Sequence, residues 1–143
     1  MTFFVARIDL RTGLLCFSNA GHNFPFHLHH DGKLKPLLKT NNLLGYSLDT
    51  QFDEQSVQLE VGDSLVFYTD GLTENENSTG EMWGEQRLRG YLRAHHQLPA
   101  QELLDGLVKE AYTFYGEQAL NDDTTLIACK VRQPFPVQGK RTV

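Results

Sequence analysis

The order of predicted elements along the chain indicates an α+β fold, because several antiparallel strands precede two helices and one last strand. Two hairpin signals support the antiparallel strands. The apolar run 2–10 is followed, after a short turn that contains a glycine, by the run 14–21. The runs 24–30 and 33–39 flank Asp31-Gly32, which is a typical hairpin turn. We therefore expect two β-hairpins before residue 40.

Two further strands follow in the sequence, with a polar segment between them and the helices. Residues 51–60 alternate between polar and apolar side chains, and residues 64–70 form a short apolar run that is typical of a buried strand. Residues 71–84 are polar and bounded by glycines, which predicts a loop of the kind that is often functional or mobile. Residues 124–132 predict the last strand.

The two predicted helices cover residues 85–96 and 99–117. In the first, Leu88, Tyr91 and Leu92 have helical spacing. The second begins with a proline and has Gly116 near its end, as helices often do. Its expected apolar stripe consists of Leu103, Leu104, Leu107, Val108, Ala111 and Tyr112.

Composition and charge narrow the class of protein. The net charge of −5 provides no general attraction for nucleic acid, so we expect no nucleic-acid partner. No apolar run approaches the length of a membrane span, and the N-terminal segment does not resemble a signal peptide. Cys16 and Cys129 form no CxxC pair and are predicted to be small buried side chains in strands. A cytoplasmic protein is the simplest interpretation.

Asp70 and the pair Asp122-Asp123 are the residues with the clearest chemical potential. Asp70 ends a buried strand and precedes Gly71, so its carboxylate is held by a rigid element and directed into a loop. Asp122 and Asp123 stand just before the last strand, where a cation or local hydrogen bonds would offset their repulsion. Taken separately, an ordinary Asp-containing turn is the better explanation of each. Together they suggest an oxygen-ligand site for Mg²⁺ or Mn²⁺.

The histidines leave alternatives open. His22, in the string SNAGHN, could contact a phosphate or could belong to a tight turn and be partly buried. His27 and His29 would share one strand face, so a metal-binding pair is conceivable. We favour the interpretation that His27, His29 and His30 are exposed around a hairpin tip.

Four strings, taken in order, resemble one known family. SNAGHN (18–23), LGYSLDTQFDEQSVQLEVGDSLVFYTDGLTE (44–74), WGEQRL (83–88) and NDDTTLIACKV (121–131) resemble the C-terminal portion of the bacterial SpoIIE-like branch of the PPM, or protein phosphatase 2C, family. The resemblance extends from about residue 2 to residue 132. Each string alone is weak, but their combination in this order is specific.

The resemblance implies an antiparallel β-sandwich flanked by helices, and residues 1–132 would be the C-terminal part of such a domain with residues 133–143 as a tail. It implies hydrolysis of phosphoserine or phosphothreonine by metal-activated water at a site for two Mn²⁺ or Mg²⁺ ions. The matching positions carry the expected roles. Asp70 and Asp122 would be metal ligands and catalytic residues, and the supporting residues would be Gly71, Asp123, Thr125 and His22.

The sequence departs from the family at its first acidic motif. The Asp of that motif bridges the two metals in the family, and no residue here matches it. Two explanations compete: the chain is a fragment of a complete enzyme, or it is a non-catalytic phosphatase-like module that binds a protein. The resemblance implies a phosphorylated protein substrate, such as an antagonist of an anti-sigma factor. A fragment would also expose a face or an edge of a sheet, so we expect a homodimer or a higher assembly.

Overall fold

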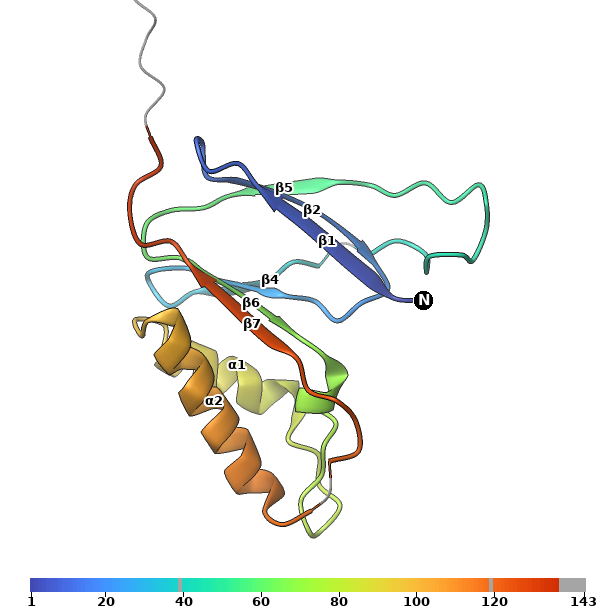
Figure 1. The fold of residues 1–143 in the computed structure, drawn as a ribbon, viewed down its shortest axis with the longest axis vertical. Helices are drawn as coiled ribbons and strands as arrows, with labels where there is room; N and C mark the ends of the chain where they lie inside the picture. The colour runs from blue at the N-terminus through green and yellow to red at the C-terminus, as the bar shows by residue number, and fades with distance from the viewer. Residues whose placement is uncertain (39, 119, 137–143) are drawn as a thin grey trace, which may run out of the picture.

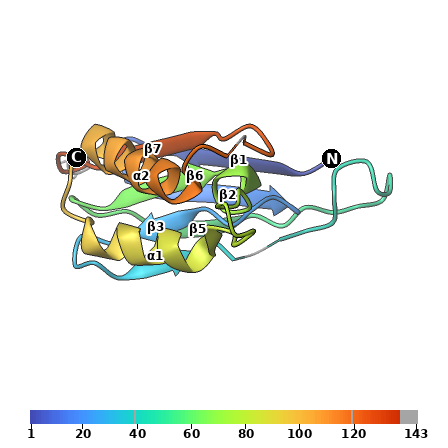
Figure 2. The ribbon, with the colours of Figure 1, turned by 90° about the horizontal axis from the view of Figure 1, so that it is seen from below.

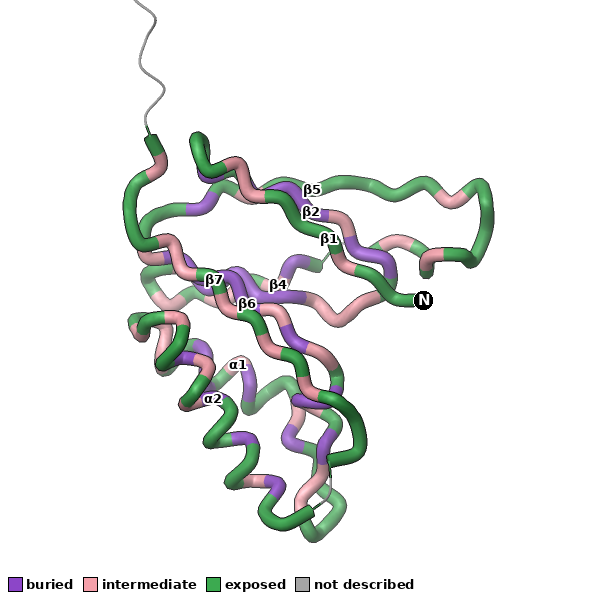
Figure 3. Tube along the Cα trace, viewed as in Figure 1, coloured by how far each residue is buried: buried purple, intermediate pink, exposed green. Residues whose placement is uncertain are grey.

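Two antiparallel sheets pack face to face, and two helices cover the outer face of one of them (Figure 1). The computed structural model describes residues 1–38, 40–118 and 120–136. Two layers of buried side chains result, one between the sheets and one between the second sheet and the helices (Figure 3). The predicted α+β sandwich flanked by helices is confirmed.

The first sheet has three strands in the order β1-β2-β5, all antiparallel. Their bounds are Phe3–Ile8 for β1, Leu14–Ala20 for β2 and Gln55–Gln58 for β5. The predicted hairpin between β1 and β2 is confirmed, with Ile8 paired to Leu15 next to the turn. Since β2 is the central strand, Leu15 and Phe17 on its inner face are almost fully buried between the sheets.

The second sheet has four strands in the order β4-β3-β6-β7, also antiparallel. Their bounds are Phe26–Leu28 for β3, Leu34–Pro36 for β4, Ser64–Tyr68 for β6 and Leu126–Lys130 for β7. The inner strand β6 alternates between the two buried layers: Leu65 faces the first sheet, whereas Val66 and Tyr68 face the helices.

Helices α1 (Gly84–Ala94) and α2 (Ala100–Tyr115) lie over the second sheet (Figure 2). The buried side chains of α2 recur every four residues, at Leu103, Leu107, Ala111 and Tyr115. The predicted stripe was too wide, because Val108 and Tyr112 are 38% and 46% exposed. A helix in an outer layer contacts the sheet along one narrow face, and these two side chains lie beside that face. Neither helix in the described ranges is long and apolar enough to cross a membrane.

Asp63, in the turn before β6, is fully buried and joins three parts of the chain. Its Oδ2 accepts hydrogen bonds from His27 Nε2 at 2.7 Å and from the Glu60 backbone N–H at 3.1 Å. Its Oδ1 accepts one from the His30 backbone N–H at 2.9 Å. Burial raises the pKa of the Asp63 carboxyl, but the hydrogen bonds from His27, Glu60 and His30 outweigh burial and hold the pKa below its ordinary value.

Two sequence predictions about burial were wrong. His27 was expected to be exposed, but it is buried because β3 is an inner strand and Asp63 accepts its hydrogen bond. Cys129 was expected to be buried, but it is exposed because β7 lies at the edge of its sheet. Cys16 is buried as predicted.

Part of the predicted tail contacts the sandwich. Phe135 packs against the layer between the sheets and lies next to Gly13, where a Cβ atom would overlap its ring. Gly13 also has a φ of 74°, which favours glycine. Residues 137–143 lie outside the described residues, and the domain boundary at residue 132 stays a prediction.

The two glycines inside the helices should respond to alanine in opposite ways. Gly90, exposed in α1, has open space around it, so Gly90→Ala should stabilise the fold by about 0.5–1 kcal/mol through helix propensity. A Cβ at Gly106 in α2 would overlap the hydroxyl of Tyr91, a buried ring that is stacked on His95. Gly106→Ala should therefore destabilise the fold by about 1 kcal/mol or more. Urea unfolding of both variants measures this, and equal effects would contradict the packing of α1 on α2.

Candidate functional site

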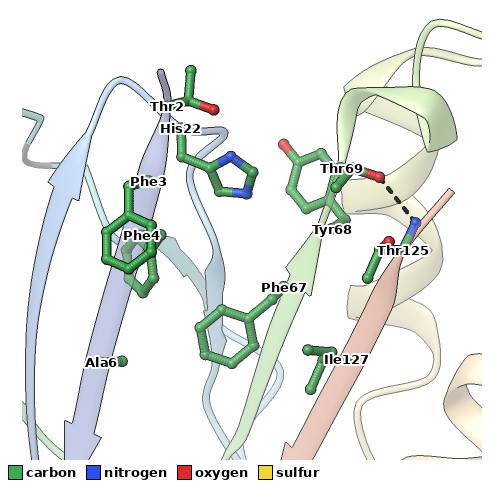
Figure 4. Close-up of a pocket in the computed structure, with 10 residues that line it drawn as sticks. All are labelled: Thr2, Phe3, Phe4, Ala6, His22, Phe67, Tyr68, Thr69, Thr125 and Ile127. Carbon is green, nitrogen blue, oxygen red and sulfur yellow. Dashed lines mark hydrogen bonds between the residues drawn. The ribbon is translucent and has the colours of Figure 1, made fainter. Parts of the chain in front are cut away.

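The end of β6 and the start of β7 are joined beyond the sheet ladder by two threonines. The Thr69 backbone N–H donates to the Thr125 carbonyl at 3.1 Å, and the Thr125 N–H donates to Thr69 Oγ1 at 2.9 Å (Figure 4). The Thr69 hydroxyl in turn donates to the Asp123 carbonyl at 3.2 Å. These hydrogen bonds therefore join the two segments that carry the predicted acidic ligands.

Gly71 brings these segments into backbone contact. After Thr69 the chain forms a short 3₁₀ turn, η1 (Asp70–Leu72), in which Gly71 is buried. A Cβ atom at Gly71 would overlap the carbonyl oxygen of Asp123 and would also press on the carbonyl of Asp122. Only glycine allows this approach without displacement of the backbone. Two loops that are far apart in the sequence thus lie against each other.

Asn75 is a positioning residue that the sequence analysis missed. Its side chain is buried; Nδ2 donates to the Gly71 carbonyl, and Oδ1 accepts from the Asn121 backbone N–H at 2.7 Å. The Tyr115 hydroxyl at the end of α2 donates to the Leu72 carbonyl. An asparagine in a polar segment carries no periodic signal, so nothing in the sequence distinguished Asn75 from its neighbours.

The predicted loop 71–84 has structure of its own. Glu76 forms an antiparallel bridge with Met82, and backbone hydrogen bonds join Trp83 to Asn75 and Gly84 to Thr73. The segment therefore folds back on itself before α1 begins, which supports Asn75 in its bridging position.

The carboxylates themselves are exposed and locally bonded. Asp70 Oδ1 accepts from the Gly71 N–H at 3.1 Å, and Asp122 Oδ1 accepts from the Asp123 N–H at 2.8 Å. Among the described residues, no salt bridge to a basic side chain neutralises Asp70, Asp122 or Asp123. Neighbouring uncompensated carboxylates repel each other, and hard oxygen donors suit Mg²⁺ or Mn²⁺. The acidic residues present therefore fit such a cation.

Asp70, Asp122 and Asp123 are few ligands for a metal site. In the part of the chain that the structure describes, these acids do not form a compact group of three potential metal ligands, alone or with another residue. This agrees with the missing bridging acid noted in the sequence. That Asp70 and Asp122 share one cation stays a prediction.

A groove of about 480 Å³ opens between β1 and the strands β6 and β7, beside the threonine pair (Figure 4). Its walls are mostly apolar side chains, and its polar rim includes His22, Thr69 and Thr125. Burial, followed by the charge of Glu85, raises the pKa of Tyr68 to about 12, so the phenol that lines the groove is neutral at physiological pH. The groove is a hydrophobic slot with few charges.

His22 lies in a tight turn, which was one of the two interpretations of its string. The buried Asn19 donates from Nδ2 to the His22 carbonyl at 2.9 Å, and Asn19 Oδ1 accepts from the His22 N–H at 2.8 Å. The partly buried ring points into the groove (Figure 4). A role in contacting phosphate stays a prediction.

Comparison with known proteins identifies relatives over nearly the whole chain. Residues 1–132 match the sequence profile described as Stage II sporulation protein E (SpoIIE). Protein IcfG of Synechocystis is 33% identical over 127 residues, which cover 89% of this chain and 20% of that protein. Phosphoserine phosphatase RsbU of Bacillus subtilis is 27% identical over 131 residues, which cover 91% of this chain and 38% of that protein.

A solved structure shows the same fold. The SiaA-PP2C domain of Pseudomonas aeruginosa superimposes with a TM-score of 0.79 at 22% identity, covering 90% of this chain and 51% of that chain. The chain thus spans about a fifth to a half of the length of these three proteins.

The close approach at Gly71 generates a prediction. Gly71→Ala should push the Asp122-Asp123 backbone away and destabilise the fold by about 1–3 kcal/mol, because the added Cβ meets backbone atoms that cannot rotate aside. Urea unfolding measures this change, and Gly90→Ala is the matched control, since a Cβ at that position meets nothing. A neutral Gly71→Ala variant would show that the two loops are not in contact.

Proposed function

This chain belongs to the SpoIIE-like branch of the PPM protein phosphatases, and we propose that it provides the Asp70 and Asp122 ligands of a metal-dependent serine/threonine phosphatase centre. The observation that carries the proposal is the backbone contact between Gly71 and the Asp122-Asp123 segment. That contact joins the backbone segments that carry Asp70 and Asp122, two residues 52 positions apart in the sequence, at the same end of two paired strands.

The proposed roles follow from these positions. Asp70 and Asp122 would hold Mg²⁺ or Mn²⁺, which when bound lowers the pKa of a water molecule and offsets charge on a phosphoryl group. Thr69 and Thr125 set the spacing of the two ligand loops through their hydrogen bonds. Asp123 contributes its carbonyl to the same network. The groove beside them would accept the substrate chain along its apolar walls.

Complete catalysis would need a further acidic ligand. The resemblance assigns the bridging role to an Asp in a motif that this sequence lacks, and the acids described here make no three-ligand group. We therefore expect Asp70 and Asp122 to bind a cation with modest affinity and expect phosphate hydrolysis to require that bridging carboxylate. A non-catalytic interaction module is the alternative.

The proposed substrate is a phosphorylated protein of a bacterial signalling circuit, such as an antagonist of an anti-sigma factor. The relative RsbU is named a phosphoserine phosphatase, which supports the phosphoserine class. A location in the cytoplasm and the lack of a nucleic-acid partner stay predictions from the sequence.

Metal binding tests the site directly. Isothermal titration with Mn²⁺ should show binding that Asp70→Asn and Asp122→Asn each weaken by about tenfold or more, because each variant removes one charged oxygen ligand. Asp49→Asn is the control, since Asp49 is exposed in a different loop. Equal Mn²⁺ affinity in all three variants would contradict a shared cation.

Activity separates the two functional hypotheses. With Mn²⁺, a phosphoserine peptide should be hydrolysed by a protein that contains this segment together with the family's first acidic motif, and Asp70→Asn should abolish that hydrolysis. Removal of the metal by EDTA should do the same. Hydrolysis that persists in Asp70→Asn would refute the proposed centre, and a complete lack of hydrolysis would favour the interaction module.

We also propose that the open edge of the first sheet mediates the predicted homodimer. Strand β1 is an edge strand, and its side chains Phe3 and Val5 are 46% and 50% exposed. Val5→Lys should convert a dimer into a monomer in multi-angle light scattering, whereas Val61→Lys, at an exposed turn position, should not. A monomeric unmodified chain at micromolar concentration would refute this proposal.

A further inference from the structure

A cluster of potential metal ligands lies at the end of the sandwich opposite Asp70. His29 and His30 follow β3, and Glu60 lies in the connection from β5 to β6. One ligand atom from each residue lies within 4.8 Å of the others. We propose that His29, His30 and Glu60 bind one transition-metal cation of the zinc class.

The distances suit a single ion with small side-chain adjustments. Glu60 Oε2 lies 3.7 Å from His29 Nε2 and 3.7 Å from His30 Nδ1. Ligand atoms that surround a tetrahedral Zn²⁺ at 2.0–2.1 Å are separated by about 3.3 Å. His30 Nδ1 also lies 3.4 Å from Asp63 Oδ1, a long contact that a bound ion would replace. The side chains of His30 and Glu60 are 46% and 61% exposed, so they can rotate to bind the ion. Three protein ligands would leave one position for water.

His29 is held in the orientation that a metal ligand requires. Its Nδ1 lies 2.8 Å from Asp31 Oδ1, and the ionised carboxylate can only accept, so Nδ1 carries the proton. Nε2, which lies 3.7 Å from Glu60 Oε2, then has a lone pair available for a metal ion. A carboxylate that accepts the second ring N–H is the usual partner of a metal-bound histidine. The Asp31-Gly32 turn thus has a chemical role beyond closing the hairpin.

Asp63 fixes the backbone positions of the other two proposed ligands, His30 and Glu60. It accepts from the backbone N–H groups of both His30 and Glu60, and its side chain is fully buried. This carboxylate therefore holds the loop after β3 and the connection from β5 to β6 at a fixed distance from each other. Because Asp63 also accepts from His27, the cluster is anchored to the inner strand β3. A supported shell of this kind preorganises a binding site.

The donor set separates this cluster from the phosphatase centre. Two imidazoles with one carboxylate favour Zn²⁺, Ni²⁺ or Cu²⁺, whereas Mg²⁺ and Mn²⁺ prefer oxygen ligands. Asp63 and Asp70 stand at opposite ends of the five-residue strand β6 (Figure 1). At about 3.3 Å per residue they are roughly 20 Å apart, too far to share an ion. The proposal is therefore independent of the proposed phosphatase function.

A bound cation would tie the two sheets together at this end. Glu60 lies after β5 of the first sheet, whereas His29 and His30 lie directly after β3 of the second sheet. An ion held by both would bind only the folded chain and would raise its stability in proportion to the free metal concentration.

Zinc titration of a protein that lacks the other site tests the proposal. In an Asp70→Asn, Asp122→Asn background, isothermal titration should show one Zn²⁺ per chain, unaffected by millimolar Mg²⁺. His30→Gln and Glu60→Gln should each weaken zinc binding by about tenfold or more, since each removes one ligand. Glu54→Gln, an exposed glutamate before β5, is the matched control and should bind as before.

Cobalt gives a second readout. Co²⁺ in place of Zn²⁺ should produce visible absorption of a tetrahedral centre in the background protein and in the control, but not in Glu60→Gln. Circular dichroism checks that each variant is folded, which the exposure of both altered side chains favours. The proposal is overturned if no zinc binds in the background protein. It is equally overturned if both ligand variants bind zinc as tightly as the control, because the contacts at 3.7 Å would then be weak surface ion pairs.

Discussion

Strand β6 and its pairing with β7 support both proposed metal-binding regions of this molecule. The ladder runs from Ser64 to Tyr68 and is continued by the hydrogen bonds between Thr69 and Thr125. Because β6 is an inner strand with side chains in both buried layers, any shift of β6 would disturb the packing of both layers. The loops at its two ends are therefore attached at fixed positions. One end carries Asp70, and the other carries Asp63.

Buried polar side chains fix the conformations of the loops around that rigid strand. Asp63 joins the β3 end to the β5–β6 connection, Asn75 joins η1 to the loop before β7, and Asn19 closes the turn at His22. Each of these groups is buried, and burial of a polar group is costly unless hydrogen bonds compensate it. Rearranging any of these loops would leave such a group unsatisfied, so the loops have one preferred arrangement.

The two ends of β6 differ in the chemistry of the groups that they present. The Asp70 end offers carboxylates and backbone carbonyls, which are hard oxygen donors. The Asp63 end offers the imidazoles of His29 and His30 and the carboxylate of Glu60, and Asp31 orients the His29 ring. One fold can hold such different donor sets because the strand fixes the positions and the adjoining loops carry the donor groups. In an inner antiparallel strand, loops at opposite ends are constrained by the same ladder but remain chemically independent.

The sequence by itself determined the hairpins, the helices and the candidates Asp70 and Asp122, because these depend on local patterns: alternation, helical spacing and turn residues. Only the tertiary structure decided that His27 is buried, that Cys129 is exposed and that Asn75 bridges two loops. It also brought Glu60 to His29 and His30. Burial and long-range contact depend on which strand becomes an inner one and which segments pair across the chain, and residues far apart in sequence decide that pairing.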